Sequence, residues 1–180
     1  QKDNLESLIK ELNKQFGDDS VTKISDMERA DVEFVKTNCY SLDYVFGGGL
    51  PRGRIVEIFG QESSGKSALS LYMIAQIQKN GGTALLVDAE FAFNKSFADK
   101  IGVKTDELIV SQPTTGEDAL EIVRKFVESN EIDIIVVDSV ASLVPQKELD
   151  GDIGDANIAL QARMMSKALR MLTGVVAKTK

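Results

Sequence analysis

Residue types that support several common chemistries are missing or rare in this sequence. Its 180 residues contain no histidine and one cysteine, Cys39. Without histidine the chain lacks the commonest general base and the commonest zinc ligand. A lone cysteine cannot form a disulfide within the chain, which indicates a reducing compartment, so we expect a cytoplasmic protein.

Long apolar runs and an excess of basic residues are missing as well. No run is long enough to span a bilayer and nothing resembles a secretion signal, so we expect no membrane partner. The net charge of −7 argues against a broad polyanion-binding surface, and any nucleic-acid site must be a local basic patch. With 43% hydrophobic and 27% charged residues, the chain suits one globular α/β core of ordinary size.

The most specific motif present is GQESSGKS, residues 60–67, which fits the phosphate-loop pattern G-x-x-x-x-G-K-[ST] at every position. Gly60 and Gly65 allow backbone angles that turn successive N–H groups toward phosphate oxygens. Lys66 supplies positive charge to the outer phosphates, and Ser67 offers a hydroxyl to Mg²⁺. The motif predicts binding of a nucleoside triphosphate.

Both flanks of the motif support this prediction. Residues 54–59 read as a buried strand, and residues 67–78 form a helical run without glycine or proline. The loop would then open a helix, whose N-terminal dipole favours phosphate. An ordinary glycine turn is the alternative, and the complete pattern in this context argues against it.

Two carboxylates follow expected strands. Residues 83–87 form a second buried strand that leads to Glu90, which is either a solvated loop acid or the base that orients attacking water. Residues 132–138 end in Asp138 after a continuous apolar run, which is typical of a parallel strand buried on both sides. Asp138 fits the Walker B position that holds Mg²⁺ through its water shell, and a surface carboxylate is the alternative.

Strands are also expected near residues 32–35 and 108–110, and a helix from Thr114 or Thr115 to about residue 130. Residues 148–157 read as a mobile loop, and a helix follows from residue 158. Alternation of strands and helices predicts an α/β fold with a mostly parallel sheet. The last helix has an apolar stripe and a basic stripe, the latter either solvated or in contact with DNA. The stripes consist of Met165, Leu169 and Leu172, and of Arg163, Lys167 and Arg170.

Residues 1–16 form an expected amphipathic helix that ends at Gly17. It could pack on its own domain or serve as an arm that docks on a neighbouring subunit, and the residues alone favour neither.

Further motifs coincide with one family. Residues 48–58 (GGLPRGRIVEI), 87–90 (VDAE), 111–117 (SQPTTGE), 136–141 (VVDSVA), 151–155 (GDIGD) and 162–166 (ARMMS), with the phosphate loop, resemble the bacterial RecA recombinase family. The resemblance covers essentially the whole chain. It implies a RecA-like P-loop NTPase fold, with residues 1–32 as a helical oligomerisation arm and residues 33–180 as an ATPase core that is incomplete at its C-terminal end.

The resemblance also implies roles for matching positions. Glu90 and Lys66 would be catalytic, and Ser67 and Asp138 would hold Mg²⁺. In the family, Asp and Tyr usually occupy the adenine positions that Asn94 and Phe97 take here. Nucleotide contacts are implied for Gly60, Gln61, Glu62, Ser63, Ser64, Gly65, Lys66, Ser67, Ala68, Asn94 and Phe97, and DNA contacts for Ile158, Arg163, Ser166 and Arg170.

The function implied is that of an ATP-dependent recombinase in DNA recombination, DNA repair and the SOS response. Such a DNA-dependent ATPase binds single- and double-stranded DNA, forms a helical filament through its arm and promotes strand exchange. The alternative is a truncated, non-catalytic relative that binds nucleotide or caps a filament. A GTPase or metabolite kinase is disfavoured because Asn94-Lys95-Ser96-Phe97 lacks the final aspartate of the guanine motif N-K-x-D.

In the family, the next strand starts after the position of Lys180 and lies between the phosphate-loop strand and the Walker B strand. Without it, backbone groups of both strands would lack partners, at about 1–3 kcal/mol for each buried group. We therefore expect these residues to be a fragment or part of a longer chain.

Overall fold

A computed structural model describes residues 2–17, 20–23, 25, 32–152 and 159–177. The chain divides into two compact units, residues 1–32 and residues 33–180. In the described part of the chain, no helix is both long enough and apolar enough to cross a membrane.

The first unit contains helix α1, Lys2–Phe16, which confirms the amphipathic helix expected there. Gly17 ends it with a φ of 108°, and its N–H donates to Asn13 O at 3.0 Å. The Asn13 side chain then holds the returning chain, because Nδ2 donates to Val21 O at 2.9 Å and Oδ1 accepts from Val21 N at 2.8 Å. Leu8 and Phe16 leave apolar surface exposed on this unit.

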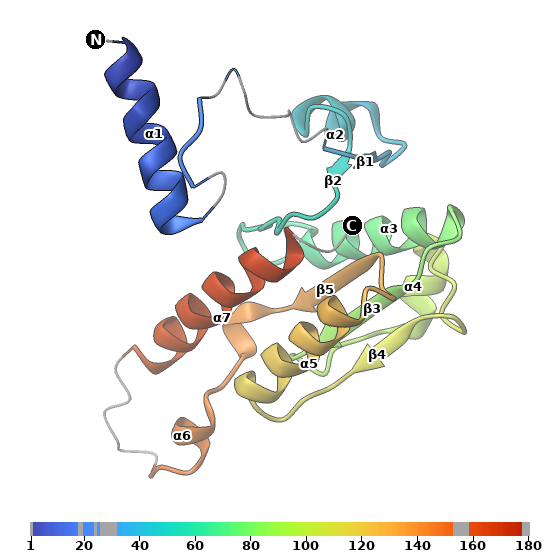
Figure 1. Cartoon of the computed structure of the whole chain (residues 1–180). Coiled ribbons are helices and arrows are strands. Elements are labelled where there is room, and N and C mark those ends of the chain that lie inside the picture. The colour runs from blue at the N-terminus through green and yellow to red at the C-terminus, as the bar shows by residue number, and fades with distance from the viewer. Residues whose placement is uncertain (1, 18–19, 24, 26–31, 153–158, 178–180) are drawn as a thin grey trace. The chain divides into compact units, whose positions relative to one another are not determined.

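The second unit is built on a parallel sheet of three strands in the order β4-β3-β5 (Figure 1). The strands are β3, Ala84–Asp88, β4, Ile109–Ser111, and β5, Ile134–Asp138. Helices α3, Lys66–Lys79, and α4, Lys95–Ile101, pack on one face. Helices α5, Gly116–Ser129, and α7, Leu160–Val176, pack on the other. This arrangement confirms the expected α/β fold and parallel sheet.

The central strand and its neighbour differ in burial. Every residue of β3 is buried, because β3 pairs on both sides and both faces carry helices. Every residue of β5 is only half-buried. The expectation of a strand buried on both sides is therefore wrong for β5, since among the described residues β3 is the only strand that pairs with it.

The buried strand expected over residues 54–59 is not formed. This segment has no regular secondary structure and is exposed along its length, with Phe59 86% exposed. A strand needs a neighbour for its backbone N–H and C=O groups, and in the described part of the chain none lies beside it. The apolar sequence therefore suits a strand, but the described residues supply no strand that pairs with it.

A small substructure precedes this segment. Strands β1, Phe34–Val35, and β2, Leu50–Pro51, pair antiparallel, with helix α2, Tyr40–Val45, between them. β1 confirms the strand expected near residues 32–35, whereas α2 was not expected. Gly49 lies so close to β1 that an added Cβ would sit 2.9 Å from the carbonyl carbon of Val35.

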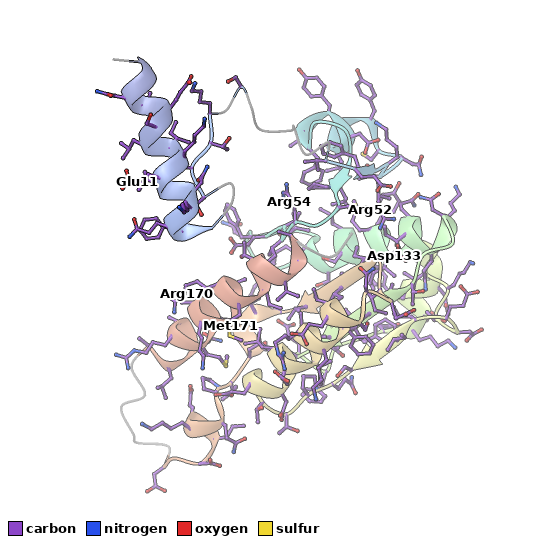
Figure 2. The ribbon with its side chains drawn as sticks, in the orientation of Figure 1. Glu11, Arg52, Arg54, Asp133, Arg170 and Met171 are labelled. Atoms are coloured by element: carbon purple, nitrogen blue, oxygen red, sulfur yellow. The ribbon has the colours of Figure 1, made fainter. Side chains whose placement is uncertain are left out.

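Arg52, in the turn after β2, anchors this substructure to the sheet. Its Nη1 lies 3.1 Å from Asp133 Oδ1, just before β5 (Figure 2). Asp133 Oδ2 in turn accepts from Thr83 N at 2.9 Å, just before β3. One carboxylate thus aligns the starts of two strands and the incoming turn.

The C-terminal part differs in detail from the sequence prediction. Thr115, not Thr114, caps α5, because its Oγ1 accepts from Asp118 N at 3.0 Å. Glu148 lies in a short helix, α6, Gln146–Leu149, and not in a loop. Residues 153–157, half of the expected loop, lie outside the described residues. Ile158, where the last helix was expected to begin, does too, and the structure has α7 from Leu160.

The prediction for the apolar stripe of α7 is wrong at one position. Leu172 is buried and Met165 packs against the core, but Leu169 is 41% exposed. Met164, which was not part of the predicted stripe, packs against the core instead of Leu169. Positions 164, 168 and 172 are spaced four residues apart and so share one face of the helix.

Candidate functional site

The phosphate loop leads directly into α3, as its motif predicts. Gly65 is the residue before the helix and has a φ of 92°, and Ser63 has a φ of 57°. Lys66, in the first turn, extends its side chain back over the loop, where Nζ donates to Gly60 O at 3.0 Å and to Gln61 O at 2.8 Å. The ammonium is therefore held beside the backbone amides that would face phosphate oxygens.

Glu90 lies in the turn that follows β3 and reaches the end of β5. Its Oε1 accepts a hydrogen bond from Ser139 Oγ at 2.6 Å, and Ser142 Oγ lies 3.4 Å away. The Glu90 side chain is exposed, so water can reach it. The structure thus places Glu90 beside the strand that ends in Asp138.

Backbone pairing explains this closeness. Asp88 and Asp138 are register partners at the ends of β3 and β5, and Ala89 N donates to Asp138 O at 2.8 Å. Because parallel strands end at the same edge of a sheet, both predicted acids arrive there together. This edge is where open α/β sheets bind their ligands.

The available oxygen ligands suit Mg²⁺ better than a metal ion that takes all its ligands from protein side chains. Ser67 offers an exposed hydroxyl and Asp138 a half-buried carboxylate, both hard oxygen ligands. Within the described residues, no three His, Cys, Asp or Glu side chains cluster to hold a metal ion. Mg²⁺ suits such a sparse site because it keeps several waters and takes phosphate oxygens as ligands.

Asp88 is a site residue that the sequence reasoning did not single out. It is 4% exposed and accepts from Ala92 N at 3.1 Å, from Phe93 N at 3.0 Å and from Gln112 Nε2 at 2.9 Å. Burial alone would raise the pKa of Asp88, but the hydrogen bonds from Gln112 and from the backbone amides together lower it below its ordinary value. Asp88 therefore fixes the turn that carries Glu90. An acid as the last residue of a fully apolar strand was the available signal.

The two residues assigned to the adenine ring lie at the start of α4. Asn94 caps this helix, with Oδ1 accepting from Phe97 N at 3.0 Å. The Phe97 side chain is 46% exposed. The amide oxygen of Asn94 thus has a structural partner, and the Phe97 ring has an open face on which a base can stack.

The three described candidates for DNA contact lie on one helix. Arg163, Ser166 and Arg170 are exposed on α7, and their spacing of three and four residues places them on one face (Figure 2 labels Arg170). Lys167 is exposed beside them. The ion pairs between described residues involve none of these three cations. Ile158 lies outside the described residues.

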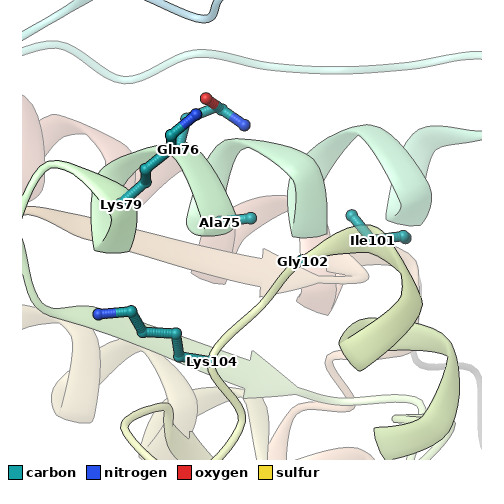
Figure 3. A pocket seen from close by; sticks show the side chains of 6 residues that line it. All are labelled: Ala75, Gln76, Lys79, Ile101, Gly102 and Lys104. Carbon is teal, nitrogen blue, oxygen red and sulfur yellow. The ribbon is translucent and has the colours of Figure 1, made fainter.

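A hollow of about 370 Å³ lies between α3 and the end of α4 (Figure 3). Gln76, Lys79 and Lys104 supply its polar lining. Lys79 is at the opposite end of α3 from Lys66, roughly 20 Å away at 1.5 Å per residue. The hollow is therefore separate from the phosphate loop.

Comparisons with known proteins point to one family. The family model described as RecA N-terminal domain matches residues 3–180. Protein RecA from Clostridium tetani is 52% identical over 176 residues, which are 97% of this chain and 50% of that protein. Protein RecA from Clostridium novyi is 53% identical over 177 residues, 98% of this chain and 51% of that protein, and the Rhodopirellula baltica protein is 48% identical, with 98% and 47% covered. This chain spans about half the length of these curated relatives.

Proposed function

The chain belongs to the RecA family, and from this premise we propose that it supplies the ATPase site and a DNA-contacting helix of an ATP-dependent DNA recombinase. In this proposal the protein acts in homologous recombination and DNA repair, as part of the SOS response, in the cytoplasm. It binds ATP with Mg²⁺, single- and double-stranded DNA, and further copies of itself.

One observation supports the ATPase assignment above the others. The Glu90 carboxylate accepts a hydrogen bond from Ser139, the residue after Asp138, at 2.6 Å. Both lie at the end of the sheet, and helix α3, which packs on this sheet, follows the phosphate loop directly. A base, a metal-supporting carboxylate and a phosphate-binding loop are the parts that phosphoryl transfer to water requires. No covalent intermediate with the protein is needed.

Each residue then has a limited task. The loop amides and Lys66 would bind the phosphates, and Ser67 and Asp138 would hold Mg²⁺, which would supply positive charge beside the phosphate oxygens. Glu90 accepts the proton of the attacking water, and Ser139 orients the Glu90 carboxylate through its hydrogen bond. Phe97 stacks on the base, and Asn94 fixes the start of α4 beneath it.

Two surfaces serve the macromolecular partners. Arg163, Ser166 and Arg170 contact the DNA backbone, for which cationic and hydroxyl groups on one exposed face are suited. Residues 1–32 act as the arm, because α1 exposes apolar side chains that a neighbouring copy would cover. Residues 33–180 form the ATPase core.

The test is ATP hydrolysis by this chain with and without single-stranded DNA, with Lys66→Ala as the blank. Turnover above the blank that rises with DNA is the expected result. Nucleotide binding without turnover would instead favour the non-catalytic binding module. Absence of nucleotide binding in the parent chain would contradict both.

A further inference from the structure

A glutamine in the first turn of α7 is bonded to the segment that follows β5. Gln161 Nε2 donates to Val140 O at 3.1 Å, Ala141 O at 2.9 Å and Leu143 O at 3.0 Å. An amide NH₂ has two hydrogens, so at least one is shared between two carbonyls. The 3₁₀ turn η1, Val140–Ser142, and the residue after it have four backbone carbonyls, and this one side chain donates to three of them.

The same turn carries the hydroxyl groups that face Glu90. Ser139 precedes η1 and donates to Glu90 Oε1 at 2.6 Å, and Ser142 closes the turn by donating its N–H to Ser139 O at 3.2 Å. Leu143, 2% exposed, anchors the far end in the core. A shift of η1 therefore moves both hydroxyls relative to the Glu90 carboxylate.

Helix α7 connects this turn to the exposed basic face. Gln161 and Arg163 lie within one helical turn of each other, with Gln161 directed at η1 and Arg163 exposed. Met164 and Leu172 pack the opposite side of α7 onto α5 and the sheet. Because Gln161 and the basic side chains lie on one helix, a displacement of the exposed face also displaces Gln161.

We propose that Gln161 is a positioning residue that couples DNA on the exposed face of α7 to the setting of Glu90. The coupling rests on the proposed function, and it adds a route that runs from α7 through Gln161 and η1 to Ser139 and Glu90. DNA on α7 fixes the helix, Gln161 fixes η1, and the Ser139 hydroxyl then holds the carboxylate in its catalytic orientation.

The chemistry of the side chain decides which variant to use. Gln161→Met keeps a similar length and volume but removes the donor, so the three carbonyls lose their shared partner. Gln146→Met is the matched control, because among the described residues Gln146 Nε2 bonds only to Asp150 Oδ1, just after α6. Neither glutamine is among the residues proposed to contact ATP or DNA.

The experiment measures kcat and KM for ATP with and without an oligothymidylate, and the affinity for that oligonucleotide by fluorescence anisotropy. For Gln161→Met we expect DNA-free turnover, KM and oligonucleotide affinity within about twofold of the parent. We expect the DNA-stimulated increase in kcat to fall about tenfold or more, since hydrogen bonds that orient a catalytic group contribute on this scale. Gln146→Met should keep the full increase.

The outcomes separate this inference from the proposed function. A parent chain without DNA-stimulated turnover overturns both. A stimulated parent whose Gln161→Met variant retains the full stimulation overturns the coupling alone.

A second measurement needs no variant and so does not depend on Gln161→Met folding. The amides of Ser142 and Leu143 donate within the turn, to Ser139 O and to Val140 O at 3.2 Å each. Their hydrogen exchange in the parent chain should slow severalfold when oligothymidylate is added, because fixing α7 fixes η1. Exchange at residues 142–143 that is unchanged at saturating oligonucleotide would overturn the proposal.

Discussion

Ser139 donates its hydroxyl hydrogen to Glu90 Oε1 at 2.6 Å, which joins the turn after β3 to the end of β5. Ser142 lies farther from the same oxygen, at 3.4 Å, near the limit of a hydrogen bond. We expect Ser139→Ala to lower kcat about tenfold or more, because a hydrogen bond to a charged group contributes about 1.5–3 kcal/mol. Steady-state phosphate release measures this. Ser142→Ala is the matched control and should change kcat less than about twofold, and equal losses in the two variants would argue against a specific role for Ser139.

Glu90→Gln separates ATP binding from hydrolysis. The amide keeps the shape of the side chain and can still accept from Ser139, but it cannot take a proton from water. We expect unchanged affinity for a fluorescent ATP analogue and a kcat lowered by about 10²–10⁴, the usual contribution of a general base. If Glu90→Gln hydrolyses ATP at the parent rate, Glu90 is not the base.

Asp88 should make stability depend on acid pH. Its pKa in the folded chain lies below the ordinary value of 3.8, so the unfolded state binds a proton more readily than the folded state. The stabilisation is fully present above about pH 3.8 and is lost as the pH falls through the lower folded pKa. Urea unfolding at a series of pH values should show a shallower loss of stability in Asp88→Asn than in the parent between about pH 5 and pH 3.

The control for this experiment is Asp106→Asn, because the Asp106 side chain is 92% exposed. At neutral pH it should lie within about 0.5 kcal/mol of the parent, because the exposed ion pair of Asp106 with Lys95 contributes little. At neutral pH, Asp88→Asn should also be less stable by about 1–3 kcal/mol, since its new NH₂ group must face either the Ala92 donor or the donors of Phe93 and Gln112. An Asp88→Asn variant with the parent's stability at every pH would contradict the role given to this carboxylate.

The α7 arginines should govern the salt dependence of DNA binding. Replacing Arg163 or Arg170 by Gln should weaken oligothymidylate binding and reduce the slope of log K against log salt by about 0.7 for each phosphate that the variant no longer neutralises. Anisotropy titrations at several salt concentrations measure both. Lys125→Gln, an exposed cation on α5, should leave the slope unchanged. An equal reduction in all three variants would mean that net charge, and not α7, determines binding.

The cap of α5 should contribute measurably to stability. Thr115 Oγ1 accepts from Asp118 N at 3.0 Å, so Thr115→Ala leaves that amide without its partner. We expect a loss of about 1 kcal/mol in the free energy of unfolding. The neighbouring Thr114 is exposed and does not cap the helix, so Thr114→Ala should lie within about 0.5 kcal/mol of the parent.

The sequence predicted those parts of the site that local pattern determines. The motif and the strand ends indicated the phosphate loop, Glu90 and Asp138, whose roles stay predictions. The parallel pairing of β3 with β5 brings these two acids to one edge of the sheet. The bond of Gln112 to Asp88 and the contact of Gln161 with η1 were not predicted, because they join segments more than 15 residues apart in the sequence.

The failed prediction over residues 54–59 has a different cause. The apolar pattern there has strand character, but a strand also needs a partner, and the sheet of the described residues ends at β5. The half-buried state of β5 has the same origin. An apolar pattern shows that a segment can form a strand, but the strand forms only where another strand pairs with it.

The open edge of β5 has a consequence for the behaviour of the chain at high concentration. Its sequence, IIVVD, contains no lysine, proline or bulge of the kind that protects sheet edges, and its outer backbone groups have no strand partner among the described residues. Such an edge is a template onto which another copy, or the exposed apolar segment 54–59 of another copy, can add a strand. We therefore expect self-association of the chain to increase with protein concentration.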